Sequence, residues 1–421
     1  MAAVAASFGP YVLPGVRLEQ LFYFGGAAVV VGVSLTKWPA LDSKGRPLVK
    51  FGVIGLFLVS WSIYFFGSLV SMAFHGGGVG SYVAGDALAG INRLLLPLSA
   101  AIVALGFARL AKGQDLFKVA CLALVLFTCA NSVVAVVQVA NPDLTWLYAW
   151  NAIEEGRASV FSNAAELGRY SGIFNQPAEA GLAYSMAGIC AAYYYRSRPI
   201  RSVPIMSLIA LGGLLSVSKI FLFVGVPLMI LVALVVSTRR TFLLYWLSVA
   251  IVGIYFCIPF LSSTWSGFGY ATRFWGGAEP SGDGFLSTLT GGRLGGASGT
   301  LERVSSSVLE QFPLLGVGAQ GLQTAYDSAW VEALIVAGLV GVFALTVAQT
   351  ALTIGAVRLT GSKRVVAVSL CVVMWAVSIG LPALNANRSG SALVLLLVLA
   401  MATVSIPNGV RKSGRGYVLN E

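Results

Sequence analysis

The sequence predicts an all-α polytopic integral membrane protein with eleven or twelve transmembrane helices. Of its 421 residues, 57% are hydrophobic and only 10% are charged, which is too apolar for a soluble chain of this length. Apolar runs of roughly 18 residues or more recur to the end of the sequence, and each is long enough to cross a bilayer as a helix. Basic residues gather in the short links between these runs, as is typical of membrane proteins.

Eleven apolar runs account for the expected spans, and together they form a single membrane domain over residues 1–421. We place them at residues 18–36, 50–72, 90–109, 118–139, 178–195, 202–217, 219–236, 241–260, 329–354, 365–381 and 389–406. With eleven spans and a cytoplasmic C-terminus, the N-terminus lies outside. A short further helix in the first 17 residues would give twelve spans and an N-terminus inside, and the sequence leaves both open.

The distribution of positive charge assigns a side to each link. The formal net charge is +11, and 18 of the 27 basic residues fall in alternate links. The positive-inside rule places those links in the cytoplasm. Because the charge follows membrane topology, we expect no nucleic-acid partner. The 18 residues are Lys37, Lys44, Arg46, Lys50, Arg109, Lys112, Lys118, Arg196, Arg198, Arg201, Arg239, Arg240, Arg358, Lys363, Arg364, Arg411, Lys412 and Arg415.

Cysteine and histidine usage gives no sign of a metal centre. The five cysteines lie inside apolar runs and do not have the spacing of metal ligands. His75 is the one histidine, and it stands in the loop-like stretch "FHGGGVG". We therefore expect packing roles for the cysteines, no metal and no cofactor.

Two outward links are long and are expected to be loops, at residues 140–177 and 261–328. The first contains "TWLYAW", whose tryptophans suit an amphipathic helix lying at the membrane interface. The second holds 14 glycines between residues 261 and 327, which favours a loop with a few short helices. We expect one of these helices in "SGTLERVSSSVLEQF", with Ser298 or Thr300 near its N-cap and Pro313 just past its end.

Nine basic residues remain, and all fall at outward positions, which the positive-inside bias disfavours. We expect Arg17, Arg157 and Arg273 to be solvated or to snorkel at the interface. Lys219 in "LLSVSKIFLF" lies between two spans with almost no loop, and Arg388 in "LNANRSG" is similar. Ionisable groups at membrane depth usually mark a pathway or a ligand. The nine are Arg17, Arg93, Arg157, Arg169, Lys219, Arg273, Arg293, Arg303 and Arg388.

Several arginines and a lysine converging on one outward cavity would suit an anionic ligand. A guanidinium group pairs bidentately with phosphate oxygens, and lysine adds a point charge. A lipid-linked pyrophosphate is the natural candidate, because its polyprenyl tail stays in the bilayer. The stretch "GVGAQG" lacks the Gly-Lys-Ser/Thr ending of a nucleotide-binding loop, so we do not assign it to ATP.

Three stretches occur in a characteristic order on these links. In "GRYSGIFNQPAEAG", residues Arg169 to Pro177 follow an Arg-x-x-Gly-x-Phe-x-x-Pro pattern just before a span. In "SVSKIF", a small-residue turn precedes Lys219. In "ERVSSSVLEQFPLLGVGAQG", Arg303 precedes a Pro-Leu-x-Gly-x-Gly run at residues 313–318. On this topology the set resembles the O-antigen ligase and polymerase family of bacterial envelope enzymes, which usually has arginine in place of Lys219.

The resemblance implies a membrane-embedded glycosyltransferase of the GT-C type with two large periplasmic loops. Such an enzyme acts without a metal at the periplasmic face of the bacterial inner membrane. It transfers a glycan, with inversion, from an undecaprenyl-pyrophosphate-linked oligosaccharide. The basic residues expected to hold the pyrophosphate are Arg169, Lys219, Arg293, Arg303 and Arg388, of which Arg169 and Arg303 are also expected to be catalytic.

Arg303 is supported by the motif, whereas Arg293 is chosen only because it is isolated among uncharged residues. The alternative for both is ion pairing with the loop acids. Those acids are Asp283, Glu302 and Glu310.

One departure from the family pattern favours a polymerase of the Wzy type. Lipopolysaccharide ligases of the family carry a histidine at the start of the helix after the long loop, where this chain has Asp327 in "AYDSAWVE". A polymerase would join lipid-linked repeat units, and a chain-length regulator protein would be a candidate partner. The alternatives are a ligase that transfers glycan to lipid A–core, and a lipid-linked glycan flippase or transporter. A transporter should show two related halves or interrupted helices, and we identify neither in the sequence.

Asp327 is the expected general base or acceptor-positioning group, since a partly buried carboxylate can accept a hydroxyl proton. Asp327 would also suit a helix N-cap, and both roles are compatible. Glu166, Glu179 and Glu332 are alternative acids or bases. Glu179 follows Pro177 and would also suit a first-turn acid facing the helix dipole.

Overall fold

The computed structural model describes residues 1–13, 16–36, 52–75, 87–110, 114–141, 144–151, 159–240, 267, 300–321, 328–386 and 388–402. At residues 35, 36, 199 and 300–304 it describes the backbone alone. Statements below about groups that are absent or unpaired refer to these residues.

Most of the described chain is helical. The longer helices are α2 (Leu18–Thr36), α3 (Gly52–His75), α4 (Ala87–Leu110), α5 (Leu116–Ala140), α8 (Pro177–Tyr194), α9 (Pro199–Leu215), α10 (Val226–Val236), α15 (Ala329–Val357), α16 (Gly361–Gly380) and α17 (Ser389–Ala402). The shorter elements are α1 (Ala2–Ser7), β1 (Tyr11–Leu13), β2 (Val16–Arg17), α6 (Thr145–Trp150), α7 (Val160–Glu166), the π-helical turn η1 (Phe221–Gly225), α14 (Thr300–Gln311) and the 3₁₀ turn η2 (Ala319–Gly321).

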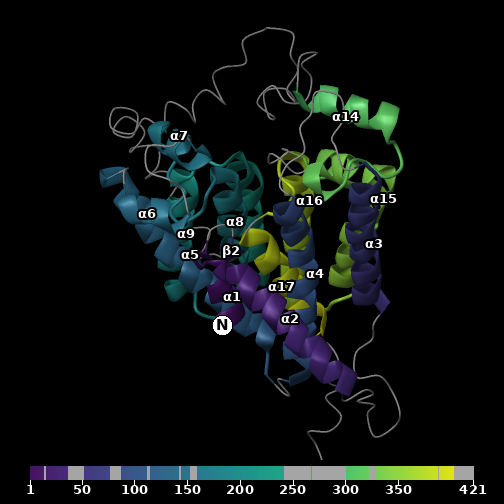
Figure 1. Cartoon of the computed structure of the whole chain (residues 1–421). Helices are drawn as coiled ribbons and strands as arrows, with labels where there is room; N and C mark the ends of the chain where they lie inside the picture. The colour runs from purple at the N-terminus through teal and green to yellow at the C-terminus, as the bar shows by residue number, and fades with distance from the viewer. Residues whose placement is uncertain are drawn as a thin grey trace, which may run out of the picture.

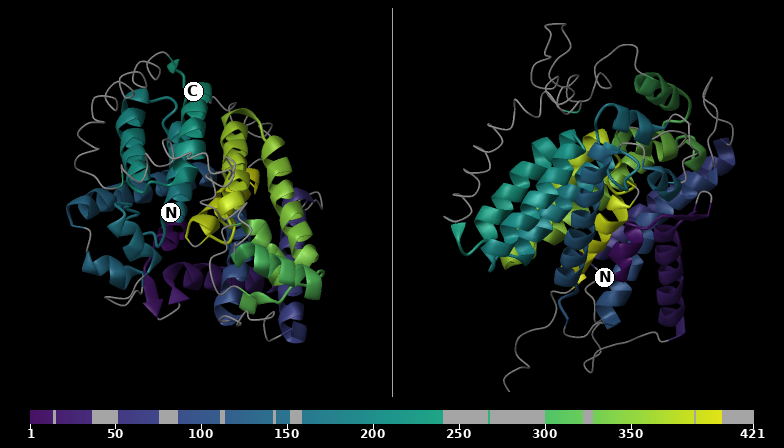
Figure 2. Two further views of the ribbon diagram at one scale, coloured as in Figure 1. Left: turned by 90° about the horizontal axis from the view of Figure 1, so that it is seen from above. Right: turned by 90° about the vertical axis from the view of Figure 1, so that its left-hand side faces the viewer.

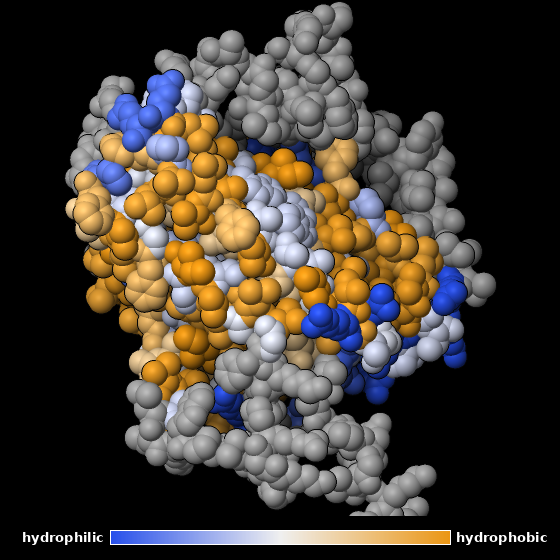
Figure 3. Space-filling model, turned by 90° about the vertical axis from the view of Figure 1, so that its right-hand side faces the viewer, coloured by the Kyte–Doolittle hydropathy of each residue, from blue (hydrophilic) through white to orange (hydrophobic). Residues whose placement is uncertain are grey.

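These helices coincide with the predicted spans to within a few residues, except for the run at 241–260, which lies outside the described residues. Five helices, α3, α4, α5, α15 and α16, are long and apolar enough to cross a membrane. Large apolar side chains are exposed on them, among them Phe66 (59%), Phe74 (77%) and Phe343 (72%). Figure 3 shows a broad apolar band on the side where α3 and α15 lie. This is the architecture of a multi-pass α-helical membrane protein.

The helices pack side by side, with α8 and α9 on one flank, α4 and α17 in the middle and α3 and α15 on the other flank (Figures 1 and 2). Small residues allow close contact between them. A Cβ atom at Gly188 of α8, for example, would lie 2.6 Å from Sδ of Met229 in α10.

One end of the molecule, here called the inward end, collects those links predicted to be cytoplasmic that the structure describes. Nζ of Lys363 pairs with Oδ1 of Asp115 at 2.9 Å, which joins the α15–α16 link to the start of α5. Nζ of Lys118 lies 5.4 Å from the ring centre of Tyr194, at the end of α8. The backbone N–H of Thr238, after α10, donates to the Arg196 carbonyl at 3.3 Å. Four of the six links predicted to share one side therefore do so, and the other two, at residues 37–50 and 411–415, lie outside the described residues.

The opposite end, here called the outward end, brings together the first residues of α4, α8, α15 and α17. α7 and α14 also lie there (Figure 1). α14 forms where the sequence predicted a helix, and its C-terminal residue is followed by Phe312, whose ring lies 4.1 Å from that of His75 at the end of α3.

The N-terminal segment does not form the additional transmembrane helix that the sequence left open. α1 has six residues, so it is only about 9 Å long and cannot span a bilayer. It is followed by an antiparallel hairpin in which Tyr11 faces Arg17, a small departure from the all-α expectation. Ser7 Oγ lies 3.1 Å from Tyr23 Oη and 3.3 Å from Ser391 Oγ, so the segment is packed into the helical bundle. A twelfth span is therefore not formed by these residues.

α15 is interrupted, which the sequence analysis did not predict. Ala337 has φ −139°, and Gly338 has φ +61° and ψ −154°, so neither is helical. The Pro-Leu-x-Gly-x-Gly run at 313–318 fills the break, because the N–H groups of Leu339 and Val340 donate to the carbonyls of Pro313 (2.9 Å) and Leu314 (3.2 Å).

The run also donates to the other side of the break. The N–H groups of Val317 and Gly318 bond to the carbonyls of Ile335 (2.8 Å) and Val336 (2.9 Å). A Cβ atom at Gly316 would lie 2.5 Å from the Ile335 oxygen, so only glycine permits this approach. The motif glycines therefore have a structural role here.

Gly338→Ala is expected to destabilise the protein by roughly 2–3 kcal/mol. A methyl group would clash with the Leu314 carbonyl, and φ is in the left-handed region. Thermal unfolding in detergent measures this, with Gly25→Ala as the control because a Cβ there meets nothing within 4 Å. Equal melting temperatures for the two variants would show that the break is not a rigid feature.

Candidate functional site

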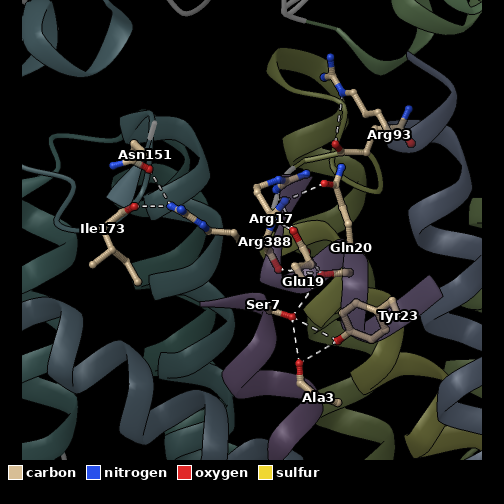
Figure 4. A network of polar contacts seen from close by, with 12 residues as sticks. Ala3, Ser7, Arg17, Glu19, Gln20, Tyr23, Arg93, Asn151, Ile173 and Arg388 are labelled. Carbon is tan, nitrogen blue, oxygen red and sulfur yellow. Dashed lines mark hydrogen bonds and ion pairs between the residues drawn. The ribbon is translucent and has the colours of Figure 1, made fainter. Parts of the chain in front are cut away.

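Arg388 is the centre of a buried polar network at the outward end (Figure 4). Its side chain reaches away from α17, and Nη1 donates to Oδ1 of Asn151 at 3.0 Å and to the carbonyl of Ile173. Its backbone N–H donates to Oε2 of Glu19 at 3.1 Å. The residue is 2% exposed and has φ +49°, a strained conformation for a residue other than glycine. Arg388 thus joins three segments that are distant in sequence.

Glu19 is the second member of this network. Its Oε2 pairs with Nη1 of Arg17 at 2.7 Å, and its Oε1 accepts from Oγ of Ser391. The backbone N–H of Arg17 donates to Oε1 of Gln20 at 2.9 Å. The expectation that Arg17 is solvated is wrong: Arg17 is 4% exposed, because the hairpin turns it into the bundle, where Glu19 neutralises it. Arg157 and Arg273 lie outside the described residues.

Glu179 adds a second buried carboxylate beside this network. It stands in the first turn of α8, as predicted, and is fully buried. Arg388 and Arg17 attract its charge, and the Ser389 backbone at the start of α17 faces it. Even so, neither carboxylate oxygen has a hydrogen bond of good geometry to a described residue, and the same holds for Nε and Nη2 of Arg388.

Burying unsatisfied charged groups costs free energy, about 1–3 kcal/mol or more for each. Folds keep such groups mainly where they serve a function or hold water. Glu179 and Arg388, whose opposite charges attract each other, therefore mark this part of the outward end as a place where a water molecule or a ligand group would be stabilised.

Glu332 belongs to a neighbouring cluster at the start of α15. Its Oε2 lies 3.0 Å from Nη2 of Arg93, and its Oε1 accepts from Nδ2 of Asn385 at 2.7 Å. Nε of Arg93 also donates to the Asn385 carbonyl at 3.3 Å. Glu332 is fully buried and is neutralised by Arg93. The segment from Asn385 to Arg388 connects the two clusters along the chain.

Arg169 and Lys219 lie on adjoining turns. Nη2 of Arg169 donates to the Val217 carbonyl at 3.5 Å, and the Tyr170 N–H donates to the Leu215 carbonyl at 2.8 Å. Val217 has φ +43°, which is a rare conformation for a β-branched side chain. Lys219 follows it, half-buried, and η1 begins two residues later. Two of the three motif stretches are therefore in direct contact, with local strain at the contact.

Two buried amides of α5 hold the loop that carries Arg169. Oδ1 of Asn131 accepts from the Ile173 N–H at 2.8 Å, and Nδ2 donates to the Ser171 carbonyl at 3.2 Å. Oε1 of Gln138 accepts from the Gly172 N–H at 2.7 Å. Sequence reasoning missed both, although amides inside the apolar run 118–139 were a usable signal, since buried polar groups need partners.

The structure gives less information about the other predicted site residues. Asp327 and Arg293 lie outside the described residues, and Arg303 lies on α14, where the backbone alone is described. The N-cap of α15 is Ser328, whose side chain makes no capping hydrogen bond. Glu166 is exposed at the end of α7, away from the buried acids. Among the described residues, no group of three histidine, cysteine or acidic side chains could hold a metal ion.

No family model and no curated protein matches this chain. The resemblance to the O-antigen ligase and polymerase family is therefore not tested by these comparisons. Functional inference therefore depends on the residues at the outward end. Each cation there comes from a different part of the chain, and three carboxylates lie among them. Such a set is chemically suited to hold an anionic group and to exchange a proton. The cations are Arg17, Arg93, Arg169, Lys219 and Arg388, and the carboxylates are Glu19, Glu179 and Glu332.

Proposed function

We propose that this protein is a polymerase of O-antigen or exopolysaccharide repeat units, a GT-C type glycosyltransferase of the bacterial inner membrane. The observation that carries the proposal is the contact between the Arg169 loop and the Val217–Lys219 turn. It joins two motif stretches at the end opposite the basic links. An undecaprenyl-pyrophosphate-linked oligosaccharide is the substrate, and a chain-length regulator protein is a partner of such an enzyme.

In this proposal the basic side chains stabilise the leaving group. Arg169 and Lys219, together with Arg293, Arg303 and Arg388, attract the pyrophosphate as negative charge develops on it. A carboxylate, for which we propose Asp327, takes the proton from a hydroxyl group of the acceptor sugar. The hydroxyl oxygen attacks the anomeric carbon from the opposite face, the bond to the pyrophosphate oxygen breaks, and undecaprenyl pyrophosphate leaves. No metal is needed for this charge stabilisation.

The described carboxylates differ in their suitability as the base. Glu332 pairs with Arg93 at 3.0 Å and accepts from Asn385, which leaves little room for a sugar hydroxyl. Glu166 is exposed. Glu179 is fully buried, and neither of its oxygens has a hydrogen bond of good geometry to a described residue, so it is the strongest alternative to Asp327.

The proposal is tested with purified protein and one lipid-linked repeat unit, without metal or nucleotide. We expect a ladder of lengthening lipid-linked glycans on a gel. Transfer to added lipid A–core without a ladder would identify the ligase alternative instead. Absence of both products with lipid-linked oligosaccharides from the native organism would contradict glycosyl transfer.

Asp327→Ala and Arg303→Ala are each expected to lower polymerisation by at least about 100-fold, because each removes a group that acts in the transition state. Both variants should insert and elute as the wild type does, since they replace polar groups. Product gels and size-exclusion profiles measure the two effects. Wild-type ladders from both variants would exclude these residues from the site.

A lipid-linked glycan transporter is the second candidate, and the interruption of α15 favours it, because transporters often use broken helices. The location of the break favours the enzyme. Residues 339–357 alone form about 28 Å of helix, close to the thickness of the hydrocarbon core, so the break falls near the outward surface. Transbilayer movement of a fluorescent lipid-linked glycan in proteoliposomes, without chain growth, would support the transporter.

A further inference from the structure

The inward end carries an arginine patch, formed by Arg196, Arg198, Arg201, Arg239 and Arg240. These residues come from two connections: the one between α8 and α9, and the one that follows α10. They have no role in the proposed glycosyl transfer, since they lie at the end opposite the candidate site.

Defined contacts bring the two connections together. Both the backbone N–H and Oγ1 of Thr238 donate to the Arg196 carbonyl at 3.3 Å. The Arg196 guanidinium lies 4.7 Å from the ring centre of Tyr193, and Nη1 donates to the Tyr193 carbonyl at 3.2 Å. Arg196 therefore fixes the geometry of the patch, and the other four arginines are exposed around it.

Among the described residues, no carboxylate balances the positive charge of the patch. Asp115 is the one carboxylate at the inward end among the described residues, and it is paired with Lys363 at 2.9 Å. The four exposed arginines form no ion pair with any described residue. An anionic partner would therefore be attracted here without displacing a carboxylate of the described residues.

Apolar surface continues directly from the patch. Ile200 is 71% exposed between two of the arginines in sequence, and Val235 (46%) and Leu231 (53%) are exposed on the last turns of α10. Tyr194 and Tyr195 lie half-buried beside them, at the level that aromatic side chains prefer in a membrane. A ligand that fits this surface has an anionic head and an apolar tail.

We infer that the arginine patch binds the headgroup of an anionic phospholipid of the inward leaflet, with the acyl chains lying along α9 and α10. Basic pockets between transmembrane helices on the cytoplasmic side bind such lipids through charge. Free phosphate would use the arginines but not the exposed apolar side chains, so the lipid is the favoured source of the anion. This inference does not depend on the proposed enzymatic function.

The test measures binding of phosphatidylglycerol and phosphatidylcholine to the full-length protein by native mass spectrometry from detergent. The patch variant is Arg198→Gln, Arg201→Gln and Arg239→Gln together, which leaves Arg196 intact. The control variant is Arg109→Gln, Arg358→Gln and Arg364→Gln together. It removes the same charge from exposed arginines at the same end.

We expect wild type and control to prefer phosphatidylglycerol. The patch variant should bind it about 100-fold more weakly, at about fivefold for each of its three arginines. An equal loss of phosphatidylglycerol binding in the control, or no loss in the patch variant, would overturn the inference. The arginines would then serve only to set the membrane topology. Competition by free phosphate at equal phosphate concentration would also overturn it. If the triple variant does not fold, the single variants Arg198→Gln and Arg239→Gln provide the same comparison.

Discussion

Arg169→Ala is expected to abolish glycan polymerisation, lowering it by at least about 100-fold, while the protein still folds and inserts. Arg169 is half-buried, and the backbone of its loop is held by the side chains of Asn131 and Gln138, so the loop should keep its place when the Arg169 bond to the Val217 carbonyl is lost. Arg169→Lys should recover only part of the activity, because lysine cannot bind phosphate bidentately.

Lys219 supplies an internal comparison for this prediction. The family usually has arginine at the equivalent place, so Lys219→Arg is expected to keep activity, whereas Lys219→Ala should lose it. The matched control is Arg358→Ala, an exposed arginine at the inward end. Initial rates of repeat-unit joining measure all five variants. Equal rates for Arg169→Ala and Arg358→Ala would remove Arg169 from the site.

Glu19→Ala is expected to destabilise the fold by about 3–5 kcal/mol, because it would leave Arg17 buried without its counter-charge. It would also remove the acceptor for Ser391 and for the Arg388 N–H. Thermal unfolding in detergent is the measurement, with Glu166→Ala as the control because that acid is exposed. Glu19→Gln keeps the shape and should lie between the two.

A melting temperature for Glu19→Ala that equals that of Glu166→Ala would mean that the outward end does not depend on this network. The loss of stability should come with a loss of activity, because the same network orients the loop at Ile173 through Arg388. A stable Glu19→Gln variant with reduced activity would separate the two effects.

The helices were predictable because each apolar run is long enough to indicate a transmembrane helix without information from the rest of the chain. The sides of the links were predictable for a similar reason, since arginine and lysine cluster locally in sequence. The inward contacts of Lys363, Lys118 and Arg196 agree with that assignment.

The outward network was only partly predictable, because its partners are distant in sequence. Arg388 was identified from its position next to a span, but its bonds to Asn151 and Ile173 depend on tertiary packing. Arg17 was misjudged because no local pattern indicates that a short hairpin will bury it. The interruption at Gly338 was missed for the same reason, since the partner that fills it is a loop rather than a neighbouring turn.

The central proposal is that the outward end joins glycans by displacing a pyrophosphate lipid. The most direct measurement is the amount of undecaprenyl pyrophosphate released for each new glycosidic linkage, in proteoliposomes supplied with lipid-linked oligosaccharides from the native organism. We predict one molecule released per linkage with wild-type protein, and a rate of both release and linkage formation at least about 100-fold lower with Arg169→Ala. Movement of the lipid-linked glycan across the bilayer with neither release nor chain growth would contradict the proposal.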